Sequence, residues 1–235
     1  MIFLRSALFW LALLLITPPY AILALACAPL PRMVRYRVIS GWSRLVLGCL
    51  RGLCGIGWQV EGREHLPRSP AVILAKHQSA WETLAFQQIF PPQVHVLKRE
   101  LLWLPFFGWG LALMSPIAID RGRGLSAMRQ VARRGRVRLE QGFWVIVFPE
   151  GTRVKPGVHR KYRLGGAWLA AHAGAPVVPV AHNAGKFWPR NSFLKYPGKV
   201  TVRIGPPIDS EGRDPEEINA LAEMWIETQQ KSLDS

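Results

Sequence analysis

The chain is short of cysteine and of acidic side chains. Its 235 residues hold three cysteines, Cys27, Cys49 and Cys54, an odd number without the spacing of a metal site. A disulfide framework is therefore not expected, and a reducing compartment is the simpler interpretation. Fifteen Asp and Glu stand against 30 Lys and Arg, which gives a net charge of +15. Such an excess indicates an anionic partner, with nucleic acid, anionic lipid and a small acidic substrate as the candidates.

Motifs of two function classes are also missing. There is no G-x-S-x-G sequence, so the nucleophile elbow of a serine hydrolase is absent. No signature of a nucleic-acid-binding fold is recognised, and the positive charge is interleaved with apolar, membrane-like segments. A basic membrane-associated or nucleic-acid-binding protein therefore remains only as a non-enzymatic alternative, and no nucleic-acid partner is expected.

Residues 1–56 are predicted to form a membrane-anchoring helical segment. Residues 6–31 carry no charge and would measure about 39 Å as one helix, enough to cross a hydrocarbon layer of roughly 30 Å. Pro18 and Pro19 lie near the middle, and we expect them to break or kink that helix. Residues 33–56 mix apolar side chains with arginines, which is typical of an amphipathic helix in the membrane interface. An ordinary surface helix packed on the domain is the alternative.

A possible processing site lies inside this segment, because Ala24, Leu25 and Ala26 resemble a signal-peptidase site. Cleavage there would expose five arginines directly afterwards, which opposes export. The segment is therefore predicted to be an uncleaved anchor, with the bulk of the chain in the cytosol. Whether it spans the bilayer or lies in the interface stays open.

Residues 57–235 are predicted to form an α/β domain. Short β-rich runs alternate with helix-like segments, an order that favours a sheet with helices on its faces. The expected strands are residues 71–75, 94–97, 117–119, 144–148, 177–181 and 199–204. The expected helices are residues 81–89, 124–141, 164–173 and 215–231.

The first candidate site lies directly after the strand at 71–75, where His77 and Glu82 stand in the sequence KHQSAWE. The end of a strand that opens into a helix is where α/β sheets place ligands. Histidine accepts a proton near neutral pH, and a carboxylate can hold its ring in the useful tautomer. The two side chains can meet only if His77 lies in the loop and Glu82 in the first helical turn. Ser79 and Glu82 also match an S-x-x-E capping box, so Glu82 as a simple helix cap is an equal alternative.

The second candidate site is FPEGTR, residues 148–153, at the end of the strand at 144–148. Gly151 permits close backbone approach, Thr152 and nearby N–H groups add donors, and Arg153 offers a planar fork suited to phosphate. Further cations make the loop strongly electropositive: Lys155, Arg160, Lys161 and Arg163. A charged surface turn is the alternative.

A third stretch runs from Lys98 to Arg121. Its residues 101–119 carry no charge, but prolines and glycines interrupt them too often for a spanning helix. They form either a buried wall of the core or a greasy channel flanked by Lys98 and Arg121.

Together these stretches resemble the glycerolipid acyltransferase family, specifically its bacterial 1-acylglycerol-3-phosphate acyltransferases. The segment from His77 to Glu82 looks like the H-x4-D motif of that family, residues 98–121 are similar to its second motif, and FPEGTR matches the third in full. The sequence VPVA at 178–181 resembles the fourth motif. Two positions depart from the pattern, because Glu82 replaces the usual Asp and Lys76 replaces a common Asn. We expect the longer carboxylate still to reach the ring, and Lys76 to disfavour the imidazolium as a neighbouring cation.

The resemblance implies an acyltransferase domain over residues 57–235, with a mixed sheet flanked by helices. It implies that His77 removes a proton from the sn-2 hydroxyl of lysophosphatidate, that Glu82 orients His77, and that the hydroxyl oxygen attacks the thioester of acyl-CoA or acyl-carrier protein to give phosphatidic acid. The acceptor's phosphate would be held by Lys98, Glu150, Gly151, Thr152 and Arg153, while Val178 and Pro179 would lie on the acyl-donor side.

No metal is expected, and no cofactor beyond the acyl donor as co-substrate. The lipid bilayer is the expected partner. Another lyso-lipid, such as lyso-ornithine lipid, is the alternative acceptor.

Overall fold

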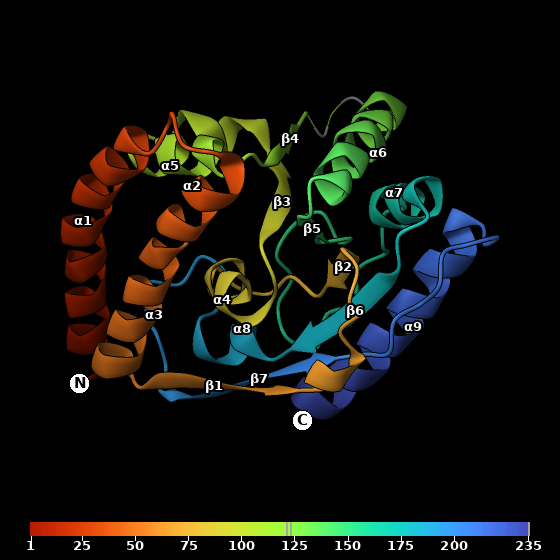
Figure 1. Ribbon diagram of the computed structural model, residues 1–235. Helices are drawn as coiled ribbons and strands as arrows, with labels where there is room; N and C mark the ends of the chain where they lie inside the picture. Colours follow the sequence, from red (N-terminus) through yellow and green to blue (C-terminus); the bar gives the residue numbers. More distant parts are fainter. Residues whose placement is uncertain (121, 123, 235) are drawn as a thin grey trace.

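A single mixed sheet organises the chain in a computed structural model, which describes residues 1–120, 122 and 124–234. Arg121, predicted to flank the apolar stretch, lies outside the described residues. The strand order is β1-β7-β6-β2-β5-β3-β4, and neighbours run parallel except for the antiparallel pair β6 and β7 (Figure 1). The strands are β1 (Ile56–Glu61), β2 (Val72–Ala75), β3 (Gln93–Lys98), β4 (Ile117–Ile119), β5 (Trp144–Val147), β6 (Val177–His182) and β7 (Gly198–Ile204). The predicted α/β fold with a mixed sheet is confirmed.

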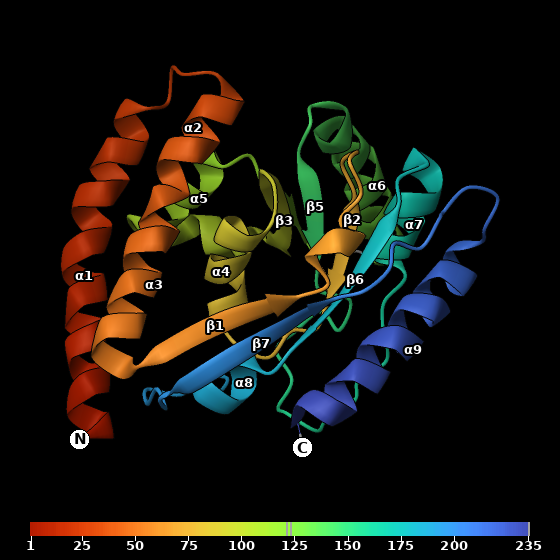
Figure 2. The same ribbon diagram turned by 60° about the horizontal axis from the view of Figure 1, so that its bottom comes forward.

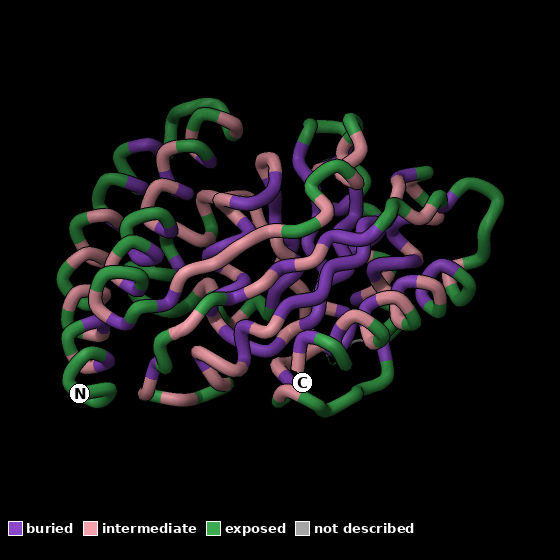
Figure 3. The backbone as a smooth tube through the Cα atoms, turned by 90° about the horizontal axis from the view of Figure 1, so that it is seen from below, coloured by how far each residue is buried: buried purple, intermediate pink, exposed green. Residues whose placement is uncertain are grey.

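Helices cover both faces of this sheet (Figure 2). One face shares an apolar core with α1 (Ile2–Ala26), α3 (Gly41–Cys54), α4 (Trp81–Ile89) and α8 (Ala184–Phe187). The other face packs against α6 (Gly124–Glu140), α7 (Gly165–Ala173) and α9 (Pro215–Asp234). The shorter elements are α2 (Arg32–Ile39), α5 (Phe107–Leu113) and the 3₁₀ turns at Arg63–His65 and Arg99–Trp103. The central strands β2 and β5 are buried along their whole length, as the continuous apolar runs of strands covered on both faces require (Figure 3).

The first helix, α1, differs from its prediction. It runs unbroken from Ile2 to Ala26 through Pro18 and Pro19, so the expected break is wrong. Each proline costs the helix one backbone hydrogen bond, but α1 packs against α3 and α5, and this packing supports the helix in spite of the loss. The Thr17 hydroxyl donates to the Leu13 carbonyl at 2.6 Å, and the Tyr20 hydroxyl donates to the Val38 carbonyl at 2.6 Å. By length and composition, with a mean hydropathy of 2.1, α1 is able to cross a membrane.

The amphipathic segment at 33–56 is two helices rather than one. Helix α3 buries Val46, Leu47, Leu50 and Cys54 in the core beside the sheet, so its apolar face packs on protein. Phe9 of α1 is buried in the same core. Helices α1 and α3 therefore share a core with the sheet, while the division of the chain at residues 56 and 57 stays a prediction.

Candidate active site

The two main sequence motifs meet because their strands are neighbours. Strands β2 and β5 pair in parallel, with Leu74 opposite Val147, so the loops that follow them leave the same edge of the sheet. The Val154 N–H donates to the His77 carbonyl at 2.8 Å and ties the two loops together. The two motifs therefore lie side by side in the structure.

His77 and Glu82 form a hydrogen-bonded pair. His77 lies in the loop and Glu82 in the first turn of α4, and the distance from His77 Nδ1 to Glu82 Oε1 is 2.8 Å. The same oxygen accepts the backbone N–H groups of Gln78 at 2.9 Å and Ser79 at 2.8 Å. Glu82 therefore caps the helix and orients the imidazole at once, and the two interpretations of its role are combined in one carboxylate. Because an ionised carboxylate only accepts, Nδ1 carries the proton and Nε2 keeps its lone pair.

The environment keeps Glu82 ionised. Burial alone would raise the pKa of this carboxyl, but nearby His182, the hydrogen bond with His77 and the Ser79 N–H hold its pKa below the ordinary value. The His77 ring also stacks on Phe148, with centroids 4.0 Å apart and planes 13° apart. The imidazole is thus fixed by a carboxylate at one nitrogen and by an aromatic face.

A second carboxylate, Glu150 of the FPEGTR loop, holds the backbone of the same histidine. Its Oε2 accepts the His77 N–H at 2.7 Å, and its Oε1 lies 2.9 Å from Lys76 Nζ. Glu150 is fully buried, and burial raises its pKa to about 7 although Lys76 opposes the shift. Both oxygens of Glu150 thus face protein groups. The charge of Lys76 is paired rather than directed at the His77 ring.

The backbone at Gly151 requires glycine. Its φ is +71°, and a Cβ there would lie 3.0 Å from Arg163 Nε. The turn carries Thr152 and Arg153 forward, and Arg153 lines the same cavity as His77. Its carbonyl accepts from Arg190 Nη1 at 2.7 Å, while no hydrogen bond or ion pair joins its guanidinium to another described residue. This cation is therefore placed to receive an anion beside His77.

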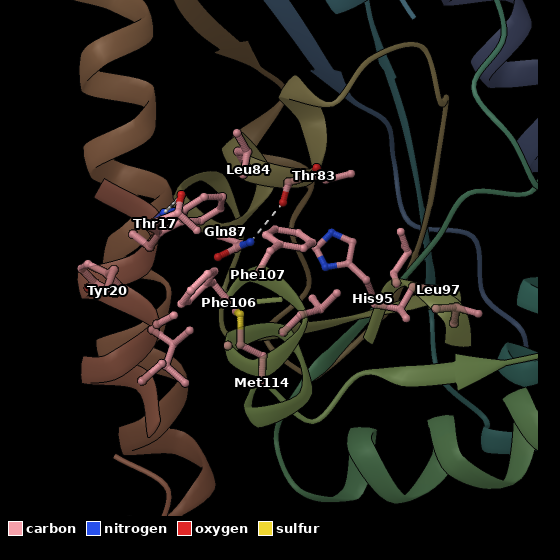
Figure 4. A pocket seen from close by; sticks show the side chains of 18 of the residues that line it. Thr17, Tyr20, Thr83, Leu84, Gln87, His95, Leu97, Phe106, Phe107 and Met114 are labelled. Atoms are coloured by element: carbon pink, nitrogen blue, oxygen red, sulfur yellow. Dashed lines mark hydrogen bonds between the residues drawn. The ribbon is translucent and has the colours of Figure 1, made fainter. Parts of the chain in front are cut away.

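The cavity beside His77 has a volume of about 200 Å³ and walls from α1, α4, β3 and α5. Figure 4 shows the side chains of Thr17, Tyr20, Leu84, Phe107 and Met114 turned toward it. The predicted greasy channel supplies one wall, through Leu101, Phe106, Phe107, Leu111 and Met114. An apolar chain can lie in this cavity with its reactive end at the imidazole.

Three predicted site residues lie elsewhere. Lys98 is exposed at the end of β3, 3.9 Å from Glu100, and does not line the cavity. Val178 and Pro179 are buried inside β6, where Pro179 lies opposite Leu74 of β2. The structure thus unites His77 and Glu82 with the Glu150–Arg153 loop, and leaves the roles of Lys98, Val178 and Pro179 as predictions.

Known proteins share both the sequence and the fold. A family model described as acyltransferase matches residues 57–183. The chain is 46% identical over 227 residues to the 1-acyl-sn-glycerol-3-phosphate acyltransferase of Pseudomonas aeruginosa, across 94% of this chain and 88% of that protein. The chain belongs to the acyltransferase family.

More distant relatives agree with this assignment. The human 1-acyl-sn-glycerol-3-phosphate acyltransferase alpha is 34% identical over 183 residues, which cover 77% of this chain and 65% of that protein. The crystal structure of the 1-acyl-sn-glycerophosphate acyltransferase from Thermotoga maritima matches with a TM-score of 0.81 at 22% sequence identity, over 99% of this chain and 95% of that one. That structural match supports the fold of this acyltransferase.

Two histidines near the site of this acyltransferase were missed from the sequence. His95 of β3 lines the cavity, and burial lowers its pKa to about 4, so it is neutral at physiological pH. His182 of β6 is fully buried, and its Nε2 lies 2.8 Å from the Lys76 carbonyl. The sequence signal that could have identified both residues is a histidine within a run of apolar strand residues. A third residue, Glu227 of α9, contacts Lys76 at 2.8 Å and has no local signal in the sequence.

Proposed function

We propose that this acyltransferase transfers an acyl chain to the sn-2 hydroxyl of 1-acylglycerol 3-phosphate and so forms phosphatidic acid. The observation that carries the proposal is the hydrogen-bonded His77–Glu82 pair, whose imidazole lies in the wall of an apolar cavity that Arg153 also lines. The names of the relatives from Pseudomonas aeruginosa and human supply the acceptor.

His77 is the general base in the proposed mechanism. Its Nε2 takes the proton of the sn-2 hydroxyl as that oxygen attacks the thioester carbonyl of the donor. The tetrahedral intermediate then collapses, the carbon–sulfur bond breaks, and the imidazolium returns the proton to the leaving sulfur. Glu82 stabilises the imidazolium, because the ionised carboxylate lies 2.8 Å from Nδ1.

Arg153 is proposed to bind the phosphate of the acceptor. A guanidinium forms two parallel hydrogen bonds to phosphate oxygens, and this one lies beside His77 without a partner among the described residues. The Gly151 N–H donates to the Phe148 carbonyl at 3.0 Å, so Thr152 is the proposed additional donor, and Lys98 contributes a more distant positive field. Glu150 fixes the loop through the hydrogen bond that its carboxylate accepts from the His77 N–H.

The donor is proposed to be acyl-CoA or acyl-carrier protein, with no further cofactor. A thioester is already activated toward an alcohol, so base catalysis and charge stabilisation meet the needs of the reaction. Val178 and Pro179 are retained on the donor side as a prediction, since both lie in β6 next to β2.

The bilayer is the proposed location of the enzyme. One face of α1 carries exposed apolar side chains at helical spacing, namely Leu4, Leu8, Leu11, Leu15 and Ile22. Helix α5 packs against α1, and the exposed aromatic residues Trp103, Phe106 and Trp109 belong to α5 and the turn before it. Together they form an apolar surface beside the cavity. We propose that this surface contacts the cytoplasmic leaflet of the inner membrane, where both lipid substrate and product reside.

The test is a transfer assay with the purified full chain. Radiolabelled acyl-CoA or acyl-carrier protein is offered with lysophosphatidate, lyso-ornithine lipid and a neutral lyso-lipid. We expect labelled phosphatidic acid, and we expect His77→Ala to lose about 10²–10⁴-fold in turnover. Transfer to lyso-ornithine lipid alone would replace the proposed acceptor, and an undiminished His77→Ala protein would remove the mechanism.

A further inference from the structure

The side chain of Lys76 is buried directly before the catalytic loop. Its ammonium donates to Glu227 Oε1 at 2.8 Å and to the Val158 carbonyl at 3.2 Å, and it lies 2.9 Å from Glu150 Oε1 in an ion pair. Lys76 and Glu150 are almost completely withdrawn from solvent, and Glu227 is one-fifth exposed. The Tyr162 hydroxyl donates to the same oxygen of Glu227 at 2.8 Å and fixes that carboxylate in turn.

This cluster is continuous with the backbone of the catalytic histidine. Glu227 holds Lys76, Lys76 holds one oxygen of Glu150, and the other oxygen of Glu150 accepts the His77 N–H at 2.7 Å. The ring of His77 is held separately by Glu82. The position of the base thus depends on the carboxylates of Glu82 and Glu150. Glu150 is in turn held by Lys76, which Glu227 of the C-terminal helix α9 contacts.

Helix α9 presents a whole polar stripe to these loops. Glu223 pairs with His159, Gln230 donates to the His182 carbonyl at 3.1 Å, and the Gly157 N–H donates to Asp234 at 3.0 Å. With Glu227 these residues recur at the spacing of helical turns and share one face of α9. Within that stripe, Glu227 alone touches Lys76.

Burial of three charges is a poor way to gain stability. Their desolvation cost offsets most of the attraction, and apolar side chains of similar volume often serve a fold as well or better. A buried polar group can instead fix one arrangement, as a single Asn fixes the register of some coiled coils. The position of this cluster directly before His77, with Lys76 held by both Glu150 and Glu227, fits that purpose here.

We propose that Glu227 is a positioning residue for the acyl transfer, acting through Lys76 and Glu150 to hold the backbone of His77. Glu227, Lys76 and Glu150 do not line the cavity, so none of them is required to touch the substrate. The inference rests on the proposed role of His77 as the base, but not on the identity of the acceptor.

The test is a double-mutant cycle with Glu227→Gln and Lys76→Met in the full chain. Gln keeps the shape and an acceptor oxygen but removes the charge, so we expect kcat to fall about fivefold with KM unchanged. Lys76→Met leaves the buried Glu150 without its cation, so this carboxyl takes up a proton and is no longer linked to Glu227, and we expect a fall of about tenfold or more. In that background Glu227→Gln has no cation to act through, so it lowers kcat no further.

Glu223→Gln is the matched control, one turn earlier on the same helix, because it alters only a contact with the exposed ring of His159. We expect its kcat to equal that of the unaltered protein. Amide hydrogen exchange of a peptide that contains His77 supplies a readout without substrate, and we expect exchange about fivefold faster in Glu227→Gln than in Glu223→Gln. Unchanged exchange with additive effects on kcat would overturn the proposal. If the unaltered protein transfers no acyl chain, the proposed function fails, while the exchange data still decide whether Glu227 holds the His77 backbone.

Discussion

A single carboxylate oxygen serves three donors at Glu82. It accepts Nδ1 of His77 and the N–H groups of Gln78 and Ser79, all at 2.8–2.9 Å. Glu82 is one methylene longer than the Asp that is usual at this position of the motif. The added length lets this side chain reach from the first turn of α4 back to the loop. The length of this side chain is therefore matched to the position of the helix.

Shortening Glu82 is expected to slow the enzyme. In Glu82→Asp the carboxylate withdraws by one methylene and cannot reach all three donors, so His77 loses its fixed orientation. We expect kcat to fall about tenfold, since small misplacements of a catalytic group are costly. Steady-state transfer assays check this, with Glu140→Asp at the exposed Arg136–Glu140 pair as the control. Equal rates for Glu82→Asp and the unaltered enzyme would contradict the role of side-chain length.

Glu150 is expected to make stability depend on pH. Its pKa is about 7 in the folded protein against an ordinary value of 4.5, so the folded chain holds this proton more tightly than the unfolded chain. The unfolding free energy therefore falls as pH rises from 4.5 to 7, by an amount on the order of 3 kcal/mol. Glu150→Gln lacks this dependence.

Urea denaturation in detergent over pH 4.5 to 8 measures the effect. We expect the unfolding free energies of the unaltered protein and Glu150→Gln to diverge between pH 4.5 and 7, with the unaltered protein losing stability relative to the variant. Parallel curves over that range would show that Glu150 keeps an ordinary pKa in the folded chain.

The sequence predicts those site residues that lie close to one another along the chain. His77 and Glu82 are five residues apart, and FPEGTR is contiguous, so each motif is visible in one short window. The partners of Lys76 lie 74 and 151 residues further along the chain, at Glu150 and Glu227, and no periodicity connects them. The sequence therefore shows Lys76 as a neighbour of His77 but not its ion pairs, and its expected effect on the charge of His77 stays a prediction.

At the scale of elements, the apolar runs were dependable predictors. All predicted strands are present, and so are the four predicted helices, with ends that shift by three residues at most. Strand β1 was not predicted, because it is largely half-buried and its sequence, IGWQVE, is not a continuous apolar run. The prolines of α1 misled because the helix is supported by its packing against α3 and α5, which come later in the chain.

Helix α1 is expected to contribute to folding through Phe9. This ring is fully buried against Trp188, with ring centroids 5.5 Å apart, whereas Leu14 on the same helix is 67% exposed. Phe9→Ala should therefore lower the unfolding free energy by about 3–5 kcal/mol, because it leaves a cavity in the core. Leu14→Ala should change it by no more than about 0.5 kcal/mol. Denaturation of both variants in the same detergent measures this, and equal losses would mean that α1 does not share the core.

At the scale of the whole molecule, the positive net charge and the exposed apolar face of α1 are both expected to contribute to membrane binding. The net charge of +15 attracts anionic lipid, at about 1 kcal/mol for each Lys or Arg near the surface. This attraction is screened by salt, while burial of the apolar face of α1 is not. Raised salt should therefore weaken binding to anionic vesicles without abolishing it.

Charges placed on the outer face of α1 test that surface directly. Leu11 and Leu15 lie one turn apart on the exposed stripe, and each is expected to bury apolar area in the bilayer worth about 1.5–3 kcal/mol. The double variant Leu11→Glu, Leu15→Glu should therefore bind vesicles of anionic phospholipid at least tenfold more weakly than the unaltered chain, as measured by flotation at fixed salt. Met224→Glu is the matched control, because Met224 is as exposed as Leu15, at 64%, but lies on α9, across the molecule from α1 (Figure 2). If the control weakened binding as much as the double variant, the outer face of α1 would not be the contact, and charge alone would hold the enzyme to the membrane.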